Sequence, residues 1–130
     1  LCNRTAARAE SLCAWDRERI IPSDAAPDTL STLAAECSLV VNCTSLGMSG
    51  TAGQFASFDF LDSLRQGSGV FDLIYSPAET ELLRQAKLRG HSAANGLGML
   101  IWQAIFALEY FTGTKVDGRA MAKLVEGVLR

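Results

Sequence analysis

Two short apolar runs, in a chain that is otherwise rich in predicted helices, constrain the fold most strongly. The first, SLVVNCT, covers residues 38–44, and the second, VFDLIY, covers residues 70–75. Both have the length and side-chain types of strands, and the first has the composition of a strand that is buried on both faces. Strands that alternate with helices form βαβ units, so the sequence predicts an α/β fold with a parallel sheet.

The segments around these runs are rich in helix formers, and prolines and glycines punctuate them. Pro77 suits the first turn of a helix, and Gly90 and Gly113 suit helix ends. The predicted helices cover residues 5–15, 28–35, 61–65, 77–90, 96–111 and 117–130, and weaker extended segments cover residues 19–21 and 91–93.

The most apolar stretch, LGMLIWQAIFAL, lies in the fifth of these helices, at residues 97–108. A membrane span needs about 20 apolar residues, so this stretch predicts a buried helix instead. The last helix has an apolar face, which predicts a C-terminal pair of packed helices. That face consists of Ala120, Met121, Leu124, Val125, Val128 and Leu129.

Polar residues and glycines follow the predicted strands. In open parallel sheets, ligands bind outside the carboxyl ends of the strands. Asn3-Arg4-Thr5, Thr44-Ser45, Tyr75 and Gly96 all lie at or just beyond such ends. The sequence therefore predicts one ligand site on this edge of the sheet.

Arg4 and Arg8 suggest what that ligand carries. A guanidinium group is a planar, permanently charged donor that suits phosphate, and an arginine after the second strand of a dinucleotide fold accommodates the 2′-phosphate of NADP. Helix N-termini also favour anions. The alternative is that Asn3 or Thr5 only caps a helix and that both arginines are solvated. Local sequence alone leaves the two interpretations open.

Four stretches occur in an order that resembles the nucleotide-binding half of shikimate dehydrogenases. They are NRTAARAESL, VVNCTSLGMSG, VFDLIYSPAETELLRQAKLRG and NGLGMLIWQAIFALEYFTG, and together they cover nearly the whole chain. Glutamyl-tRNA reductases carry a triplet similar to the first stretch, but their pattern has no place for GLGMLIWQ. The resemblance implies a Rossmann-like domain and NADP-dependent, reversible reduction of 3-dehydroshikimate to shikimate, in aromatic amino acid biosynthesis.

The resemblance also implies roles for individual residues. Gly96, Met99, Leu100 and Gln103 share a helix face by their spacing, and an amide such as that of Gln103 offers a polyol both a donor and an acceptor. The alternative for Gln103 is a bond to a backbone carbonyl. Cofactor contacts are implied for Asn3, Arg4, Thr5, Arg8, Thr44, Ser45, Leu73, Gly96 and Met99, and substrate contacts for Tyr75 and Gln103.

Two parts of the family pattern have no counterpart in these residues. One is the substrate domain with its proton-transferring lysine and aspartate, and the other is the glycine-rich loop after the first strand. We therefore expect residues 1–130 to be a partial NADP-binding domain, truncated before its second strand. No catalytic residue is assigned within it, and we expect these residues alone to be inactive.

Composition bears on the partners. A net charge of −2 gives no basic footprint for nucleic acid, and four cysteines without CxxC spacing and a single histidine predict no metal site. The cysteines are expected to be reduced, mostly buried thiols in a cytoplasmic protein without a membrane segment. The expected partner is a small-molecule substrate, and a homodimer is possible. The alternatives for function are a quinate/shikimate dehydrogenase subtype and a non-catalytic nucleotide-binding or interaction module.

Overall fold

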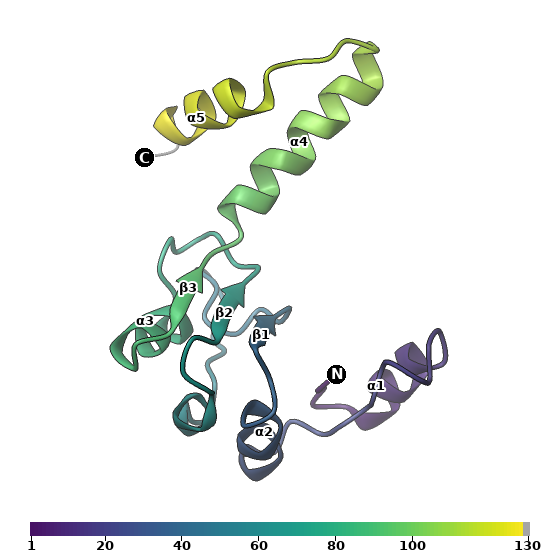
Figure 1. Cartoon of the computed structure of the whole chain (residues 1–130), viewed down its shortest axis with the longest axis vertical. Helices are drawn as coiled ribbons and strands as arrows, with labels where there is room; N and C mark the ends of the chain where they lie inside the picture. The colour runs from purple at the N-terminus through teal and green to yellow at the C-terminus, as the bar shows by residue number, and fades with distance from the viewer. Residues whose placement is uncertain (129–130) are drawn as a thin grey trace.

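The computed structural model describes residues 1–128 as an α/β unit with a projecting helical arm (Figure 1). A parallel sheet of three strands has the order β1-β2-β3, which confirms the predicted fold class. The strands are β1 (Leu39–Asn42), β2 (Gly69–Asp72) and β3 (Ser92–Ala94), and the helices are α1 (Ala6–Cys13), α2 (Pro27–Ala34), α3 (Glu81–Leu88), α4 (Leu97–Thr112), α5 (Gly118–Val128) and the 3₁₀ helix η1 (Asp59–Ser63).

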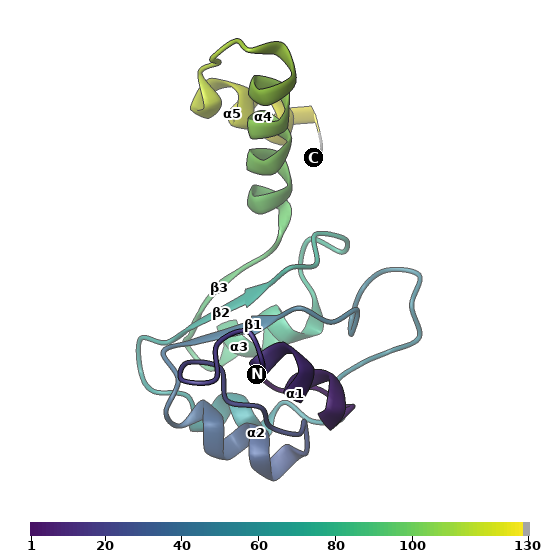
Figure 2. The same ribbon diagram turned by 90° about the vertical axis from the view of Figure 1, so that its right-hand side faces the viewer.

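The core lies on one face of the sheet. Val70 points from β2 towards α3 and is buried there with Leu82 and Leu83, while α2 and η1 complete this layer (Figure 2). On the other face, Leu39 is 54% exposed and Val41 is 45% exposed. The prediction that β1 is buried on both faces is therefore wrong, because no helix among residues 1–128 packs on its second face.

The N-terminal segment forms a single bridge instead of a strand. Cys2 pairs in parallel with Ser23, and the Ser23 amide donates to the Leu1 carbonyl at 3.0 Å. The strand predicted at residues 19–21 is absent: the Ile21 carbonyl accepts from the Leu1 amino group at 2.8 Å, but only Ser23 forms a bridge. All four cysteines are free, but only Cys13 is buried and Cys43 is exposed, so mostly buried thiols were wrongly predicted.

Helix α3 begins later than the sequence suggested. Thr80 is its N-cap, and the Thr80 hydroxyl accepts from the Leu83 amide. Pro77 lies in the preceding loop, so its predicted place in the first turn is wrong: the Thr80 cap decides where the helix starts. Hydrogen bonds from Arg84 and Gln85 lower the pKa of Glu81, in the first turn, to about 2.

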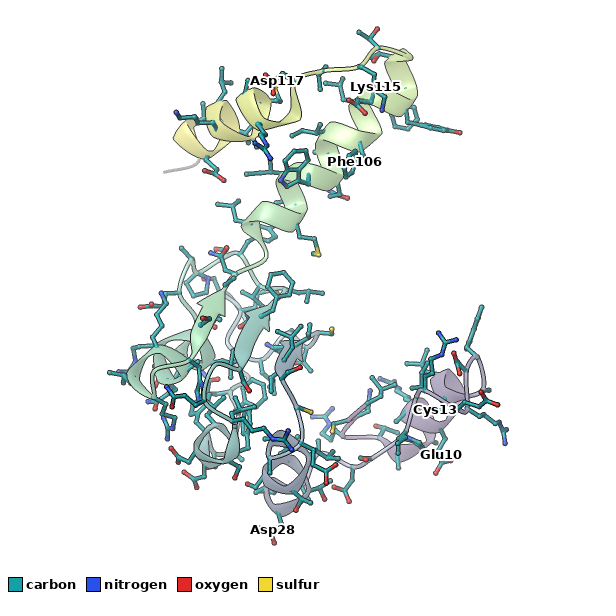
Figure 3. The ribbon with its side chains drawn as sticks, in the orientation of Figure 1. Glu10, Cys13, Asp28, Phe106, Lys115 and Asp117 are labelled. Atoms are coloured by element: carbon teal, nitrogen blue, oxygen red, sulfur yellow. The ribbon has the colours of Figure 1, made fainter. Side chains whose placement is uncertain are left out.

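Helices α4 and α5 form an arm that projects from the sheet and packs mainly on itself (Figure 1). α4 ends at Gly113, whose φ of 66° belongs to the left-handed region that glycine favours. Figure 3 shows Phe106 on α4, and Lys115 and Asp117 in the connection to α5. The Asp117 carboxylate caps α5 by accepting from the Ala120 amide at 3.1 Å.

The prediction that α4 is buried is wrong for most of the helix. Ile101 and Ile105 are buried, but Phe106 is 60% exposed and Phe111 is 84% exposed. The arm touches the sheet only at its base, so apart from the contacts between α4 and α5 most of its apolar side chains pack against no described helix or strand. On α5 no residue is buried, and Leu129, predicted for its apolar face, lies outside the described residues. No helix of residues 1–128 is long and apolar enough to cross a membrane.

Candidate functional site

A cavity of about 460 Å³ lies where β1 and β2 end. Its first wall is the loop after β1, and its second wall is the segment after β2. No charged side chain lines it, so its walls are apolar or neutral. The lining residues are Cys43, Thr44, Ser45, Met48 and Ser49 in the first wall and Leu73, Ile74, Tyr75 and Ser76 in the second.

The first wall is held by Asn42, the last residue of β1. Its side-chain oxygen accepts from the Thr44 amide at 2.9 Å and from the Thr44 hydroxyl at 2.7 Å. The Thr44 oxygen in turn accepts from the Leu46 amide at 3.2 Å. The Thr44 hydroxyl hydrogen is thus used within the wall, so this side chain presents an acceptor and no free donor to a ligand.

The two walls are joined across the cavity. The Ser49 amide donates to the Ser76 carbonyl at 2.9 Å, and the Gly47 amide donates to the Gly53 carbonyl at 2.8 Å, which closes the loop on itself. The loop is therefore held by backbone bonds to the second wall and within itself, in addition to the Asn42 side chain.

Gly96 supports the second wall from behind. Its amide donates to the Ile74 carbonyl at 3.1 Å, and a Cβ at this position would lie 2.0 Å from the Leu73 carbonyl oxygen. No side chain fits there, so only glycine lets the start of α4 approach this wall. Asn95 fixes the same junction by accepting from the Leu97 amide at 3.1 Å.

A buried carboxylate lies beneath both walls, and sequence reasoning missed it. Asp72 is fully buried and accepts from the Asn42 side-chain amide at 3.0 Å, the Ile74 amide at 3.1 Å and the Thr80 hydroxyl at 2.6 Å. The available signal was an aspartate inside an otherwise apolar strand, because a buried carboxylate needs several donors.

The structure brings together some of the predicted site residues. Thr44, Ser45, Leu73 and Tyr75 line the cavity, and Gly96 packs behind it. Tyr75 is 52% exposed, so its ring is open to a partner.

The other predicted residues lie outside the lining of the cavity. Met99 and Gln103 are exposed and lie four residues apart on α4. Before and within α1, Arg4, Thr5 and Arg8 are exposed, and neither arginine forms an ion pair with any residue in 1–128. The Asn3 side chain accepts from the Thr5 amide at 2.8 Å, which is a turn-forming role at the start of the helix.

Comparison with known proteins finds close sequence relatives. A model of the shikimate 5′-dehydrogenase C-terminal domain matches residues 96–126. The shikimate dehydrogenase (NADP(+)) of Shouchella clausii is 38% identical over 127 residues, which are 95% of this chain and 44% of that protein. The enzyme of the same name from Geobacillus kaustophilus is 38% identical over 131 residues, or 100% of this chain and 46% of that protein. The chain thus spans less than half the length of these relatives.

Solved structures share the fold. Quinate dehydrogenase from Corynebacterium glutamicum, in complex with NAD, superposes with a TM-score of 0.78 at 30% identity, over 97% of this chain and 45% of that chain. Shikimate 5-dehydrogenase from Listeria monocytogenes, in complex with shikimate and NAD, gives a TM-score of 0.74 at 26% identity, over 95% of this chain and 44% of that chain.

Proposed function

Because the chain belongs to the shikimate dehydrogenase family, we propose that the full-length protein reversibly reduces 3-dehydroshikimate to shikimate with NADPH, in aromatic amino acid biosynthesis. Residues 1–130 would be part of its NADP-binding domain. The substrate domain, the glycine-rich loop and the proton-transferring groups would lie elsewhere in the full-length protein, so no catalytic residue is assigned here.

The observation that carries this proposal is the cavity at the carboxyl ends of β1 and β2, with Gly96 behind it. In doubly wound sheets this edge is where dinucleotides bind. Thr44 and Ser45 would contact the cofactor from one wall and Leu73 from the other. Gly96 and Met99 would approach its nicotinamide end, as the family resemblance implies. The bound cofactor supplies the hydride.

The cavity has no charged lining, so phosphate recognition needs residues from elsewhere. Arg4 and Arg8 are exposed guanidinium groups near the start of α1 and have no partner in 1–128. We propose that they bind the 2′-phosphate, with Asn3 and Thr5 holding the turn that presents them. This would make NADP the preferred cofactor.

An assay of the full-length protein tests the proposed function. NADPH or NADH formation is followed with shikimate and with quinate, each at a series of concentrations. We expect the highest kcat/KM for shikimate with NADP. A higher kcat/KM for quinate with NAD would favour the second candidate, a quinate/shikimate dehydrogenase, which the likeness to the Corynebacterium glutamicum enzyme supports. Cofactor binding without any turnover would instead indicate a non-catalytic nucleotide-binding module.

Gln103 is proposed to contact the substrate. Its amide is exposed on α4, beyond Gly96 and Met99. Gln103→Ala is expected to lower kcat/KM for shikimate. The corresponding loss of transition-state stabilisation should be about 1–3 kcal/mol, the cost of a lost hydrogen bond in a closed site. NADP affinity should change less than about twofold, an effect below ~0.5 kcal/mol. Equal losses in cofactor affinity and kcat/KM would mean that Gln103 holds α4 in place.

The remaining proposals concern location and assembly. An enzyme that draws on NADPH for biosynthesis is proposed to work in the cytoplasm, with a small-molecule substrate and neither nucleic acid nor a membrane as a partner. A homodimer is the open alternative to a monomer, and light scattering of the purified full-length protein distinguishes the two by mass.

A further inference from the structure

The buried side chain of Asp72, at the end of β2, forms hydrogen bonds with three different segments. Its carboxylate is fully buried, and it forms no ion pair with any cation among residues 1–128. Three donors satisfy it instead: the Asn42 amide group, the Ile74 backbone amide and the Thr80 hydroxyl. A buried charge that depends entirely on hydrogen bonds is costly to retain.

Of these donors, one belongs to a cavity wall and a second holds the other wall. The Ile74 amide lies in the second wall, so the 3.1 Å bond to Asp72 Oδ1 fixes that wall directly. The first wall is reached through Asn42, which donates to the same oxygen at 3.0 Å and accepts from Thr44 with its other end. One carboxylate oxygen is therefore bonded to both sides of the cavity.

The carboxyl group and the Thr44 amide together decide which way Asn42 points. Asp72 Oδ1 accepts from the Ile74 amide, and the Thr44 amide can only donate, so Asn42 turns its NH₂ group towards Asp72 and its oxygen towards Thr44. The Thr44 hydroxyl must then donate to that oxygen, and its lone pairs are left for other donors. Asp72, together with the Thr44 amide, thus sets the hydrogen-bonding polarity of the Thr44 hydroxyl in the cavity lining, without touching that hydroxyl.

We propose that Asp72 is a positioning residue for the cofactor site, which acts through Asn42 and Ile74 to fix the spacing and polarity of the two walls. This inference rests on the proposed function, since the ligand to be positioned is NADPH. Its third bond, to the Thr80 hydroxyl, goes to the N-cap of α3 and to neither wall, so it provides an internal control.

The test uses full-length protein with Asp72→Ala, Asn42→Ala and Thr80→Val. Asp72→Ala removes the acceptor of all three donors, whereas asparagine could keep the bonds to Asn42 and Ile74 with its oxygen and donate to Thr80 with its NH₂ group. Asn42→Ala removes the connection to Thr44 and leaves Asp72 Oδ1 with the Ile74 amide alone. Thr80→Val removes the α3 cap and one donor, but it leaves both bonds to the walls.

Three quantities are measured for each variant: the Kd of NADPH, the melting temperature, and hydrogen exchange in residues 43–49. We expect Asp72→Ala and Asn42→Ala each to raise Kd about tenfold and to speed exchange, because each removes a hydrogen bond that holds a wall. In the double variant the Kd of NADPH should also rise by no more than about tenfold over wild type, because both changes release the first wall. Thr80→Val should lower the melting temperature while Kd stays within about twofold.

Folded Asp72→Ala and Asn42→Ala proteins with wild-type Kd would overturn the positioning role. So would a Kd that follows the melting temperature across all three variants, or additive losses in the double variant. Wild-type protein that fails to bind NADPH at all would overturn the proposed function itself, and the hydrogen-exchange data would still show whether Asp72 orders the loop.

Discussion

Alanine at position 96 is expected to disrupt both folding and activity. The added Cβ would lie 2.0 Å from the Leu73 carbonyl oxygen, and that oxygen is backbone that cannot rotate away. Overpacking a well-packed site costs about 1–3 kcal/mol and occasionally more, so we expect a loss of unfolding free energy of about 3 kcal/mol. Displacing Leu73 by about 1 Å would also lower kcat/KM by about 100-fold, because orientation of the reactants is lost. Chemical denaturation and steady-state kinetics of the full-length protein measure the two effects.

Gly127→Ala is the matched control for this substitution. Gly127 lies in α5, far along the chain from the cavity, and a Cβ there would meet nothing within 4 Å. Alanine is favoured over glycine in helices by about 0.5–1 kcal/mol, so this variant should be as stable as the wild type or slightly more stable. If Gly96→Ala had the same stability and kcat/KM as Gly127→Ala, the close approach of α4 to the second wall would not be needed for folding or activity.

Arg4→Ala is expected to weaken NADP binding while leaving NAD binding nearly unchanged. A charge-assisted hydrogen bond is worth roughly 1.5–3 kcal/mol, which corresponds to an increase in the Kd of NADP of about 10- to 150-fold. Since NAD has no 2′-phosphate, its Kd should change less than about twofold. Titration of the full-length protein with both cofactors measures the ratio.

Two further variants make the result on Arg4 specific. Arg17→Ala removes an exposed arginine in the turn after α1 and should leave both affinities unchanged. Arg4→Lys keeps the charge but loses the planar fork of donors, so it should recover only part of the NADP affinity. Equal weakening of NADP and NAD by Arg4→Ala would show that Arg4 is structural, as the alternative interpretation holds.

The sequence by itself determined the elements and the edge of the sheet that carries the cavity. Strand runs, Gly113 at a helix end and the cap before α5 are local features, and they depend on side-chain types over a few residues. The carboxyl ends of parallel strands meet at one edge, so Thr44, Ser45 and Tyr75 could be assigned to one cavity without coordinates, and the family resemblance added Leu73. The same rule assigned Asn3-Arg4-Thr5 to this edge, but these residues lie outside the lining.

The tertiary structure alone decided which surfaces are covered and what lies under the cavity. An apolar run reads alike whether it is buried or projects from the body, so the exposure of Phe106 on α4 and of Val41 on β1 could not be seen in their residue types. The same holds for Asp72, because its donors come from residues 42, 74 and 80, and only folding brings them to one carboxylate. Periodicity reports what a residue's neighbours in sequence favour, whereas burial and hydrogen bonding depend on neighbours in space.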